Sequence, residues 1–266
     1  MIRRSRAVLW IPVLLAVGVA VWWWWPRLPG LLVGDNLPAP CKAQSFEGVD
    51  YIICEVDLRT LDISIHDRGP DGKAYGSLKN FDDAMAAQGK PVLLAMNAGM
   101  YHKDLSPVGL LVDNGRELSP VATGEGAGNF FLKPNGIFLI SRDGTAAVME
   151  AGAYVAAKPD VAFATQSGPM LVIDGALHPR FDPDGTSRNI RNGVGVRDPY
   201  TVVLAIARSE VSFGSFARLF KDALGCPNAL YFDGFVSSIS NGEEMIIGGD
   251  HPVGPIIAVS AKPGIS

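Results

Sequence analysis

The chain has 266 residues, of which 48% are hydrophobic and 19% are charged, and its formal net charge is −4. This balance excludes an intrinsically disordered chain, a coiled coil and a collagen-like repeat. The length is sufficient for one large domain with a sizeable core.

The N-terminal segment is basic, whereas the remainder of the chain is acidic. Residues 1–34 contain four arginines and no acidic residue, which leaves a net charge of −8 on residues 35–266. An acidic body disfavours non-specific binding to nucleic acid, so no nucleic-acid partner is expected. Any anion that the body recognises must be held by individual arginines or backbone N–H groups.

Residues 7–25 predict a membrane anchor. These 19 uncharged residues would form a helix of roughly 28 Å, close to the thickness of the hydrocarbon layer of a bilayer. Three arginines precede the segment, which places residues 1–6 in the cytoplasm, and four tryptophans at its end suit the membrane interface. A cleaved signal peptide is the alternative, although no small-residue cleavage site follows the apolar run. In both cases the body is expected on the extracytoplasmic, periplasmic side.

Residues 26–48 are rich in proline and glycine and are interpreted as a linker, so the domain is expected over residues 49–266. An extracytoplasmic compartment permits a disulfide, and Cys41 with Cys54 is one candidate pair. Alternatively, Cys54 and Cys226 are small buried hydrophobic residues. Because the chain has three cysteines, at least one thiol is unpaired.

The body is mostly strand and turn, with two predicted helices at residues 78–88 and 213–224. Each helix follows a serine that can cap its first turn, Ser77 or Ser212, and each ends before a glycine. Apolar runs predict strands over residues 51–58, 61–66, 91–97, 201–207, 228–233 and 255–260.

Asn-Gly and Asp-Gly dipeptides predict hairpin turns, because these residues adopt positive φ angles. The dipeptides are Asn114-Gly115, Asn135-Gly136, Asp143-Gly144 and Asp174-Gly175. Strands joined by such turns, with at least two helices, indicate an α+β fold. We expect a single domain built on a mixed or antiparallel β-sheet core.

Four segments combine an apolar strand with a cluster of small and polar residues. They are residues 97–101, 165–169, 188–193 and 233–238. Strand ends of this kind bring backbone N–H groups and short polar side chains to one rim of a sheet, where binding sites often form. Taken singly, each segment is most simply a turn or a solvated charge.

These segments belong to six ordered motifs. The motifs are AMNAGMY (95–101), PVGLLVDNG (107–115), GNFFLKPNGIF (128–138), FATQSGPMLVIDG (163–175), RNIRNGVGV (188–196) and NALYFDGFVSS (228–238). As a set they resemble the phosphodiester glycosidase family, in particular its bacterial branch related to exopolysaccharide biosynthesis, over about residues 48–260. The resemblance implies a hydrolase that cleaves the glycosidic C–O bond of a sugar-1-phosphodiester in a glycan or glycolipid.

The resemblance also implies the positions of the active site. Arg191 is expected to hold the leaving phosphate through two nitrogens, with Arg188 as second choice. Asp233 is expected to activate water or stabilise the cationic sugar, with Asp174 as a weaker second. Asn97 is expected to bond sugar hydroxyls or the phosphate. The other expected substrate-binding residues are Ser167, Gly168, Gly234, Ser237 and Ser238.

The chain departs from the animal enzymes of this family after Asp233. Those enzymes have a run of glycines there, whereas this chain has Phe235, which is expected to narrow or reshape the pocket. A second hypothesis is therefore a non-catalytic glycan-binding or scaffold protein of envelope polysaccharide metabolism. The four histidines and the cysteines lack metal-ligand spacing, so neither a metal site nor a cofactor is predicted, and a metal-dependent phosphodiesterase is disfavoured. The expected partners are a sugar-phosphate or phosphoglycan substrate and the membrane.

Overall fold

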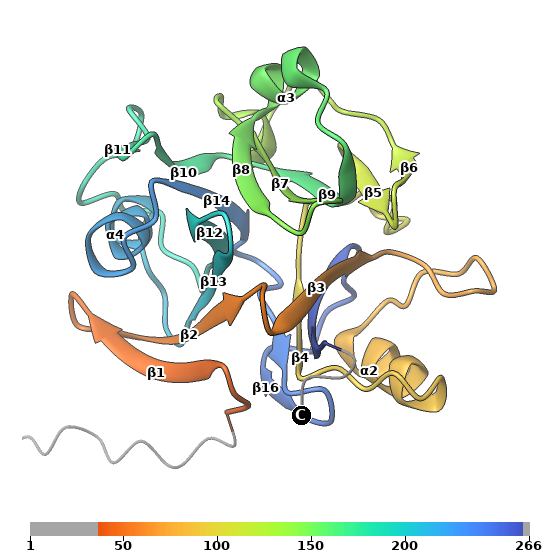
Figure 1. Ribbon diagram of the computed structural model, residues 1–266. Coiled ribbons are helices and arrows are strands. Elements are labelled where there is room, and N and C mark those ends of the chain that lie inside the picture. Colours follow the sequence, from red (N-terminus) through yellow and green to blue (C-terminus); the bar gives the residue numbers. More distant parts are fainter. Residues whose placement is uncertain (1–36, 263–266) are drawn as a thin grey trace, which may run out of the picture. The chain divides into compact units, whose positions relative to one another are not determined.

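The computed structural model describes residues 37–262, and its strands form three sheets (Figure 1). Every named pair of strands is antiparallel. The seven-stranded sheet has the order β1 (Cys41–Phe46), β2 (Val49–Asp57), β13 (Thr201–Ala207), β12 (Asn192–Asp198), β14 (Asn228–Asp233), β10 (Met170–Ile173) and β11 (Ala176–Leu177).

The other two sheets have five strands each. One has the order β16 (Met245–Ile247), β15 (Ile239–Ser240), β4 (Leu94–Asn97), β17 (Ile256–Ala261) and β3 (Leu61–His66). The other has the order β6 (Arg116–Ser119), β5 (Leu111–Asp113), β9 (Val161–Ser167), β7 (Gly136–Ser141) and β8 (Ala146–Glu150).

All three sheets contribute one face to a common core. Strand β13 shows the pattern: Val202, Leu204 and Ile206 point into that core, whereas Val203 and Ala205 pack on the opposite side of the sheet. This alternation follows from the two-residue period of a strand. It explains why 201–207 is a continuous apolar run, since both faces of β13 are covered.

A helix covers the second face of each sheet, and the three α-helices of residues 37–262 lie on the outer side of the sheets (Figure 1). Helix α4 (Phe213–Arg218) continues into the π-helix η2 (Leu219–Ala223) and covers the seven-stranded sheet. Helix α2 (Leu78–Ala87) covers β4 and β17, and α3 (Ala151–Ala157) covers β7. A short 3-10 helix, η1 (Asn129–Phe131), precedes β7. The expected α+β fold with antiparallel sheets is confirmed.

Both predicted serine caps are confirmed. Ser77 Oγ accepts from the backbone N–H of Asn80 at 3.1 Å, and Ser212 Oγ accepts from the backbone N–H of Ser215 at 3.1 Å. These bonds satisfy N–H groups that have no partner inside the helix. Helix α3 was not predicted, because its seven residues, AGAYVAA, are too short to show a helical period.

Three of the four predicted hairpin turns form, and the one at Asn135-Gly136 is wrong. Gly136 is the first residue of β7, and Asn135 is 3% exposed and donates from Nδ2 to the Phe130 carbonyl. The dipeptide therefore lies inside the fold: a local hydrogen bond uses the asparagine side chain, and Gly136 pairs with Glu150 and Ser167 in the sheet.

The predicted linker ends earlier than expected. Cys41–Phe46 is strand β1, which pairs with β2 and is joined to it by a Cys41–Cys54 disulfide. The register places Cys41 opposite Cys54, which brings the two sulfur atoms together, and Cys226 is free and buried. The predicted anchor, residues 7–25, lies outside the described residues. Among residues 37–262, no helix is long and apolar enough to cross a membrane.

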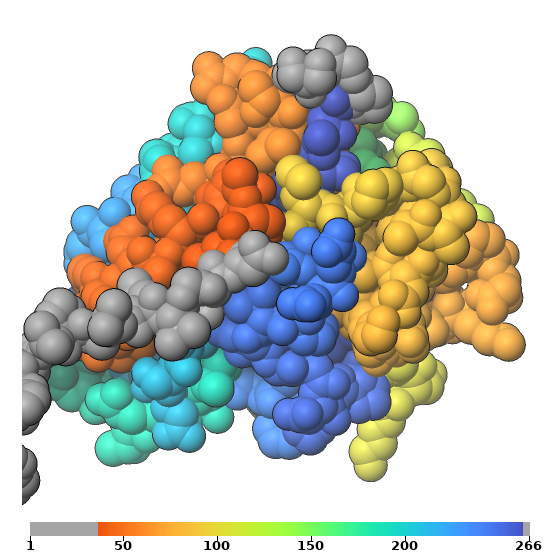
Figure 2. All heavy atoms as spheres, turned by 90° about the horizontal axis from the view of Figure 1, so that it is seen from below, coloured from red at the N-terminus to blue at the C-terminus, as the bar shows by residue number. Residues whose placement is uncertain are grey.

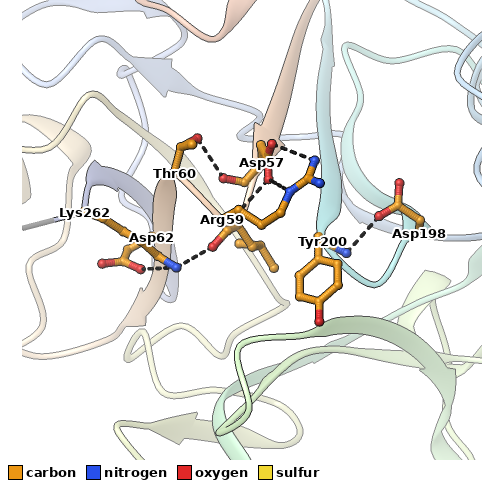
Figure 3. A network of polar contacts seen from close by, with 8 residues as sticks. Asp57, Arg59, Thr60, Asp62, Asp198, Tyr200 and Lys262 are labelled. Carbon is orange, nitrogen blue, oxygen red and sulfur yellow. Dashed lines mark hydrogen bonds and ion pairs between the residues drawn. The ribbon is translucent and has the colours of Figure 1, made fainter. Parts of the chain in front are cut away.

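A polar network surrounds the turn between β2 and β3, where the chain passes from the seven-stranded sheet to a five-stranded one (Figure 3). Arg59 donates from Nε and Nη2 to the two carboxylate oxygens of Asp57, and Lys262 Nζ donates to the Leu58 carbonyl. Tyr200 lies at the neighbouring β12–β13 turn, where its backbone N–H donates to Asp198. The Lys262 bond joins the chain after β17 to the β2–β3 turn, and the other bonds lie within their own turns.

Asp82 on α2 is a buried acid, which makes the stability of the fold depend on pH. Asp82 is 3% exposed, and burial raises the pKa of its carboxyl from 3.8 to about 6. A hydrogen bond with the Ser240 side chain of β15 lowers this pKa and so offsets part of the effect of burial. Helix α2 lies beside the C-terminal segment that carries β16 (Figure 2, yellow and blue). Because the folded state binds this proton more tightly than the unfolded state, stability falls as the pH rises from about 4 to 6.

We expect Asp82→Asn to raise the free energy of unfolding at pH 7 by on the order of 1–2 kcal/mol, because no charge is then buried. Urea titrations between pH 4 and pH 7 measure this. The control is Asp83→Asn on the same helix, since Asp83 is exposed and pairs with Lys79 at 2.8 Å. Equal pH dependence in wild type and Asp82→Asn would contradict the assignment.

Candidate active site

The four polar segments expected to form a rim meet at strand ends. Asn97 is the last residue of β4 and Asp233 the last of β14, whereas Asn192 is the first residue of β12. Asn192 is opposite Asp233 in the antiparallel β12–β14 pair, so the beginning of one strand lies beside the end of the other. Ser167 ends β9, and its hydroxyl donates to the Phe232 carbonyl at 3.3 Å.

Asn97 and Asn192, here called the asparagine pair, connect two sheets. Asn192 Nδ2 donates to the backbone oxygen of Asn97 at 2.7 Å and to its Oδ1 at 3.0 Å. Asn97 Oδ1 also accepts from the backbone N–H of Ser238 at 2.8 Å. The two asparagines are 1% and 0% exposed, and loss of a buried hydrogen-bond partner costs about 1–3 kcal/mol. The asparagine pair therefore holds the end of β4 against the start of β12.

Ser237 and Ser238 are bonded to the protein itself. Ser237 Oγ lies 3.2 Å from Asn192 Oδ1 and 3.1 Å from the Asp233 carbonyl oxygen, and Ser238 Oγ donates to the Val236 carbonyl at 2.6 Å. The two serines are 6% and 2% exposed. In this structure they position the turn after β14 and do not present hydroxyls to a ligand.

Asp233 has a carboxylate that two backbone N–H groups orient. Phe235 and Val236 both donate to Asp233 Oδ1, at 2.5 and 2.7 Å, whereas Oδ2 accepts no hydrogen bond from residues 37–262. The residue is half-buried. One oxygen of the carboxylate is therefore committed to the turn, and the other is available to a ligand.

Asp233 lines a cavity of about 450 Å³. This lies within the range of about 300–1,000 Å³ that is usual for small-molecule sites. Burial, and next the negative charge of Asp233, raise the pKa of Tyr101 to about 12, so its hydroxyl stays protonated and donates to the Pro252 carbonyl at 2.7 Å. The lining residues are Met100, Tyr101, His102, Val108, Ala127, Gly128, Asn129, Phe130, Phe131, Asp233, Phe235 and Val236.

A larger cleft of about 860 Å³ shares His102 with this cavity. Charged residues such as Arg68, Lys90 and Arg116 line it, but none of the predicted site residues does. We therefore place the candidate active site in the smaller cavity, because that cavity contains the oriented carboxylate.

Arg191 is fully buried behind the turn that follows Asp233. Its Nε donates to the Val211 carbonyl and its Nη2 to the Ser187 carbonyl, both at 2.9 Å. The guanidinium lies 3.6 Å from the centroid of the Phe213 ring, a stabilising cation–π contact. Burial lowers the pKa of Arg191, while the neighbouring Tyr231 side chain and then the charge of Asp233 act in the opposite direction. An arginine nevertheless keeps its proton, so this is a buried cation.

The structure does not present Arg191 for the expected bidentate hydrogen bonding to a phosphate. Two of its three nitrogens are used by backbone carbonyls, and the third, Nη1, lies with the Tyr231 hydroxyl against Gly234. Arg191 is not among the residues that line the cavity. It acts as a positioning residue beneath the turn.

Gly234 is required where the turn crosses Arg191. A Cβ at position 234 would lie 2.6 Å from the Tyr231 hydroxyl oxygen and 3.2 Å from Arg191 Nη1. Tyr231 is 3% exposed and packs in the core that covers the seven-stranded sheet, so it cannot move aside freely. The absence of a side chain at Gly234 lets the turn lie against the buried guanidinium.

Arg188 is exposed, and it makes no ion pair or hydrogen bond with another described residue. Its neighbour Asn189 lies beside Gly234, because a Cβ on Gly234 would be 3.3 Å from Asn189 Cβ. Of the two predicted arginines, Arg188 is therefore the exposed one.

The remaining predicted residues separate into two groups. Ser167 is fully buried, and a Cβ on Gly168 would lie 2.7 Å from the Phe130 carbonyl, so both support the wall of the cavity. Asp174, by contrast, lies in the β10–β11 turn beside Asn228, at the opposite end of β14 from Asp233. Asp174 is therefore not brought into the site.

Sequence reasoning missed Asn192, His102 and Asn129. Asn192 lies in segment 188–193, which was expected at the end of a strand. The structure instead places Asn192 at the beginning of β12. His102 directly follows the motif 95–101, so its position beside a motif was the available signal. Within residues 37–262, no group of three or more histidine, cysteine, aspartate or glutamate side chains has the arrangement of a metal site.

Comparison with known proteins places the chain in a family. A model of the phosphodiester glycosidase family matches residues 90–255. The chain belongs to the phosphodiester glycosidase family. The chain is also 33% identical over 182 residues to the Escherichia coli K12 protein described as "Uncharacterized protein YigE". The alignment covers 68% of this chain and 70% of that protein.

Solved structures share the fold of this phosphodiester glycosidase family member. The catalytic domain of zebrafish N-acetylglucosamine-1-phosphodiester alpha-N-acetylglucosaminidase is 14% identical with a TM-score of 0.58, covering 83% of this chain and 81% of that one. A hypothetical protein from Synechocystis is 12% identical with a TM-score of 0.54, covering 82% and 61%. A putative exported protein from Burkholderia pseudomallei is 14% identical with a TM-score of 0.50, covering 84% and 75%. At these identities the likeness is one of fold.

We expect Gly234→Ala to lower the free energy of unfolding by about 1–3 kcal/mol, because the added methyl group overlaps the Tyr231 hydroxyl. Chemical denaturation measures the change. In a Tyr231→Phe background, which lacks the overlapping oxygen, Gly234→Ala is expected to cost less than half as much.

Gly124→Ala is the matched control, since a Cβ there has no atom within 4 Å. A Gly234→Ala protein as stable as the Gly124→Ala protein would contradict the close approach of the turn to Tyr231.

Proposed function

We propose that this member of the family hydrolyses the glycosidic C–O bond of a sugar-1-phosphodiester in a glycan or glycolipid. The observation that carries the proposal is the Asp233 carboxylate, which two N–H groups orient at the wall of a cavity of about 450 Å³. Membership of the family supports the type of reaction. The fold shared with an enzyme named for an N-acetylglucosamine-1-phosphodiester supports a substrate of this class.

In the proposed reaction, the bond between the anomeric carbon and the phosphate oxygen breaks, and its electron pair leaves with that oxygen. The sugar passes through an oxocarbenium-like state while water attacks the anomeric carbon and gives a proton to Asp233. The products are a free sugar and a phosphomonoester. Because the leaving phosphate is a weak base, it needs little protonation as it departs.

We assign contact with the phosphate to Arg188 and support of the turn to Arg191. Arg188 is exposed, and its guanidinium has no ion pair or hydrogen bond with another described residue, so it would reach a phosphate from outside the cavity, whose lining does not include it. A guanidinium binds two phosphate oxygens well, which offsets the negative charge of an acidic body. The Asn97 Nδ2 atom is a buried donor without a partner among the described residues, but Asn97 does not line the cavity, so we assign it no contact with the substrate.

The test follows sugar release by the purified full-length protein from the methyl phosphodiester of N-acetylglucosamine-1-phosphate. Asp233→Asn is expected to lower kcat at least hundredfold, the usual contribution of a general base. Hydrolysis in oxygen-18 water is expected to label the sugar, because the C–O bond breaks.

Asp174→Asn is the matched control, because that acid lies at the opposite end of β14, and its activity is expected to equal that of wild type. Label in the phosphate, or full activity of Asp233→Asn, would overturn the proposal. Saturable substrate binding without sugar release would favour a glycan-binding protein instead.

We also propose an extracytoplasmic, membrane-anchored location for the domain, with residues 7–25 as the anchor. The Cys41–Cys54 disulfide supports an oxidising compartment, since such bonds are rare in the cytosol. The charge pattern of residues 1–34 supports a cytoplasmic N-terminus.

Reporter fusions after Ser266 test this location in bacterial cells. An alkaline phosphatase fusion, which needs an oxidising compartment, is expected to be active, and a β-galactosidase fusion is expected to be inactive. The reverse pattern would place the domain in the cytoplasm.

A further inference from the structure

The larger cleft, of about 860 Å³, has no part in the proposed reaction. The loop between β3 and α2, the end of α2 and the β5–β6 hairpin contribute to its walls (Figure 1). Asp233 does not line it, and His102 is the one residue that it shares with the smaller cavity. Its volume is within the usual range for a small-molecule site, so the cleft needs an explanation of its own.

The charge of this cleft differs from that of the acidic body. Its lining contains three cations, Arg68, Lys90 and Arg116, and two acids, Asp67 and Asp113. Lys90 and Arg116 are exposed, and neither side chain makes an ion pair or a hydrogen bond with another described residue. A concave surface with unpaired cations attracts anions, even on a protein whose net charge is negative.

Folding brings these two free cations to one cleft from different parts of the chain. Lys90 lies between α2 and β4, whereas Arg116 is the first residue of β6. Burial lowers the pKa of the neighbouring His66; the charge of Asp113 opposes this effect and that of Lys90 adds to it. The imidazole of His66 is therefore neutral at pH 7, and Lys90 and Arg116 carry the charge that is available to a ligand.

Asp67 places an unsatisfied acceptor in the wall of the cleft. The residue is 3% exposed, and its Oδ2 lies 3.1 Å from Arg68 Nε in an ion pair. Its Oδ1 is buried and has no hydrogen-bond partner among residues 37–262. Because an unpaired buried acceptor is unfavourable, the wall is completed by a ligand that brings a donor such as a hydroxyl group.

The lining also offers neutral polar groups and a flat ring. Gln88 and Ser119 can donate and accept hydrogen bonds, and the half-buried Tyr75 is fixed edge-on against Phe81, with ring centroids 5.1 Å apart. A saccharide uses all of these groups, because its hydroxyls both donate and accept and its ring has an apolar face. A small inorganic anion would use the cations alone and leave most of the cleft to water.

We propose that this cleft is a second binding site, separate from the candidate active site, and that its ligand is an acidic oligosaccharide. Lys90 and Arg116 bind the charged groups of the ligand, and a guanidinium suits the two oxygens of a carboxylate or sulfate. The neutral polar groups and Tyr75 bind the sugar rings. The site does not depend on the proposed reaction, so a protein without hydrolytic activity retains it.

The test measures the binding of four probes to the purified full-length protein by calorimetry: tetragalacturonate, a sulfated tetrasaccharide, neutral maltotetraose and inorganic phosphate. One or both acidic tetrasaccharides are expected to bind, with a Kd that rises with salt concentration. Maltotetraose and phosphate are expected to bind at least tenfold more weakly, because each lacks one part of the recognised chemistry. The two acidic probes distinguish carboxylate from sulfate.

Lys90→Gln and Arg116→Gln are each expected to raise the Kd of the acidic probe about fivefold, whereas Lys90→Arg, which keeps the charge, is expected to retain binding. Lys79→Gln on α2 is the matched control, because Lys79 is exposed and does not line the cleft. Its Kd is expected to equal that of wild type.

Binding of neither acidic probe would overturn the inference, as would binding that Lys90→Gln and Arg116→Gln leave unchanged. Phosphate that binds as tightly as the acidic tetrasaccharides would reduce the cleft to a simple anion site. Asp233→Asn separates the two sites and is expected to leave binding of the acidic probe unchanged, because Asp233 lines the other cavity. A loss in Asp233→Asn as large as that in Lys90→Gln would place the ligand in the candidate active site instead.

Discussion

The hydrogen bonds between Asn97 and Asn192 join two sheets that share no ladder, and the geometry of the candidate site depends on them. Both side chains are buried, so water cannot replace either partner, and the ends of β4 and β12 keep one relative position. The antiparallel register then places Asp233 beside Asn192. A polar contact between sheets therefore determines where the carboxylate lies, although neither asparagine is among the residues that line the cavity.

Most of the polar residues in the motifs satisfy the protein before any ligand arrives. Three of them are almost entirely buried: Ser237, Ser238 and Arg191. Ser238 and Arg191 donate to backbone carbonyls, and Ser237 is bonded to the side chain of Asn192. Such groups must be paired, because an unpaired buried donor or charge is costly. They form a rigid support for the turn after β14, and Asp233 is the motif carboxylate that reaches the cavity. Rigidity of this kind reduces the reorganisation that a reaction requires.

The turn after β14 combines opposite demands within three residues. Backbone N–H groups orient the Asp233 carboxylate. Gly234 has no side chain and therefore fits against the Arg191 guanidinium, whereas Phe235 exposes its ring to solvent. One turn therefore links the buried cation, the candidate catalytic group and the surface that a substrate meets.

The sequence by itself determined the local features: strand periods, the caps at Ser77 and Ser212, the hairpin at Asp174-Gly175 and the identity of Asp233 as a strand-end acid. These depend on neighbouring residues and on short-range hydrogen bonds. Only the tertiary structure decided that Arg191 is buried and Phe235 exposed. Burial and the choice of hydrogen-bond partners arise from contacts between residues distant along the chain, as in the 95 residues that separate Asn97 from Asn192.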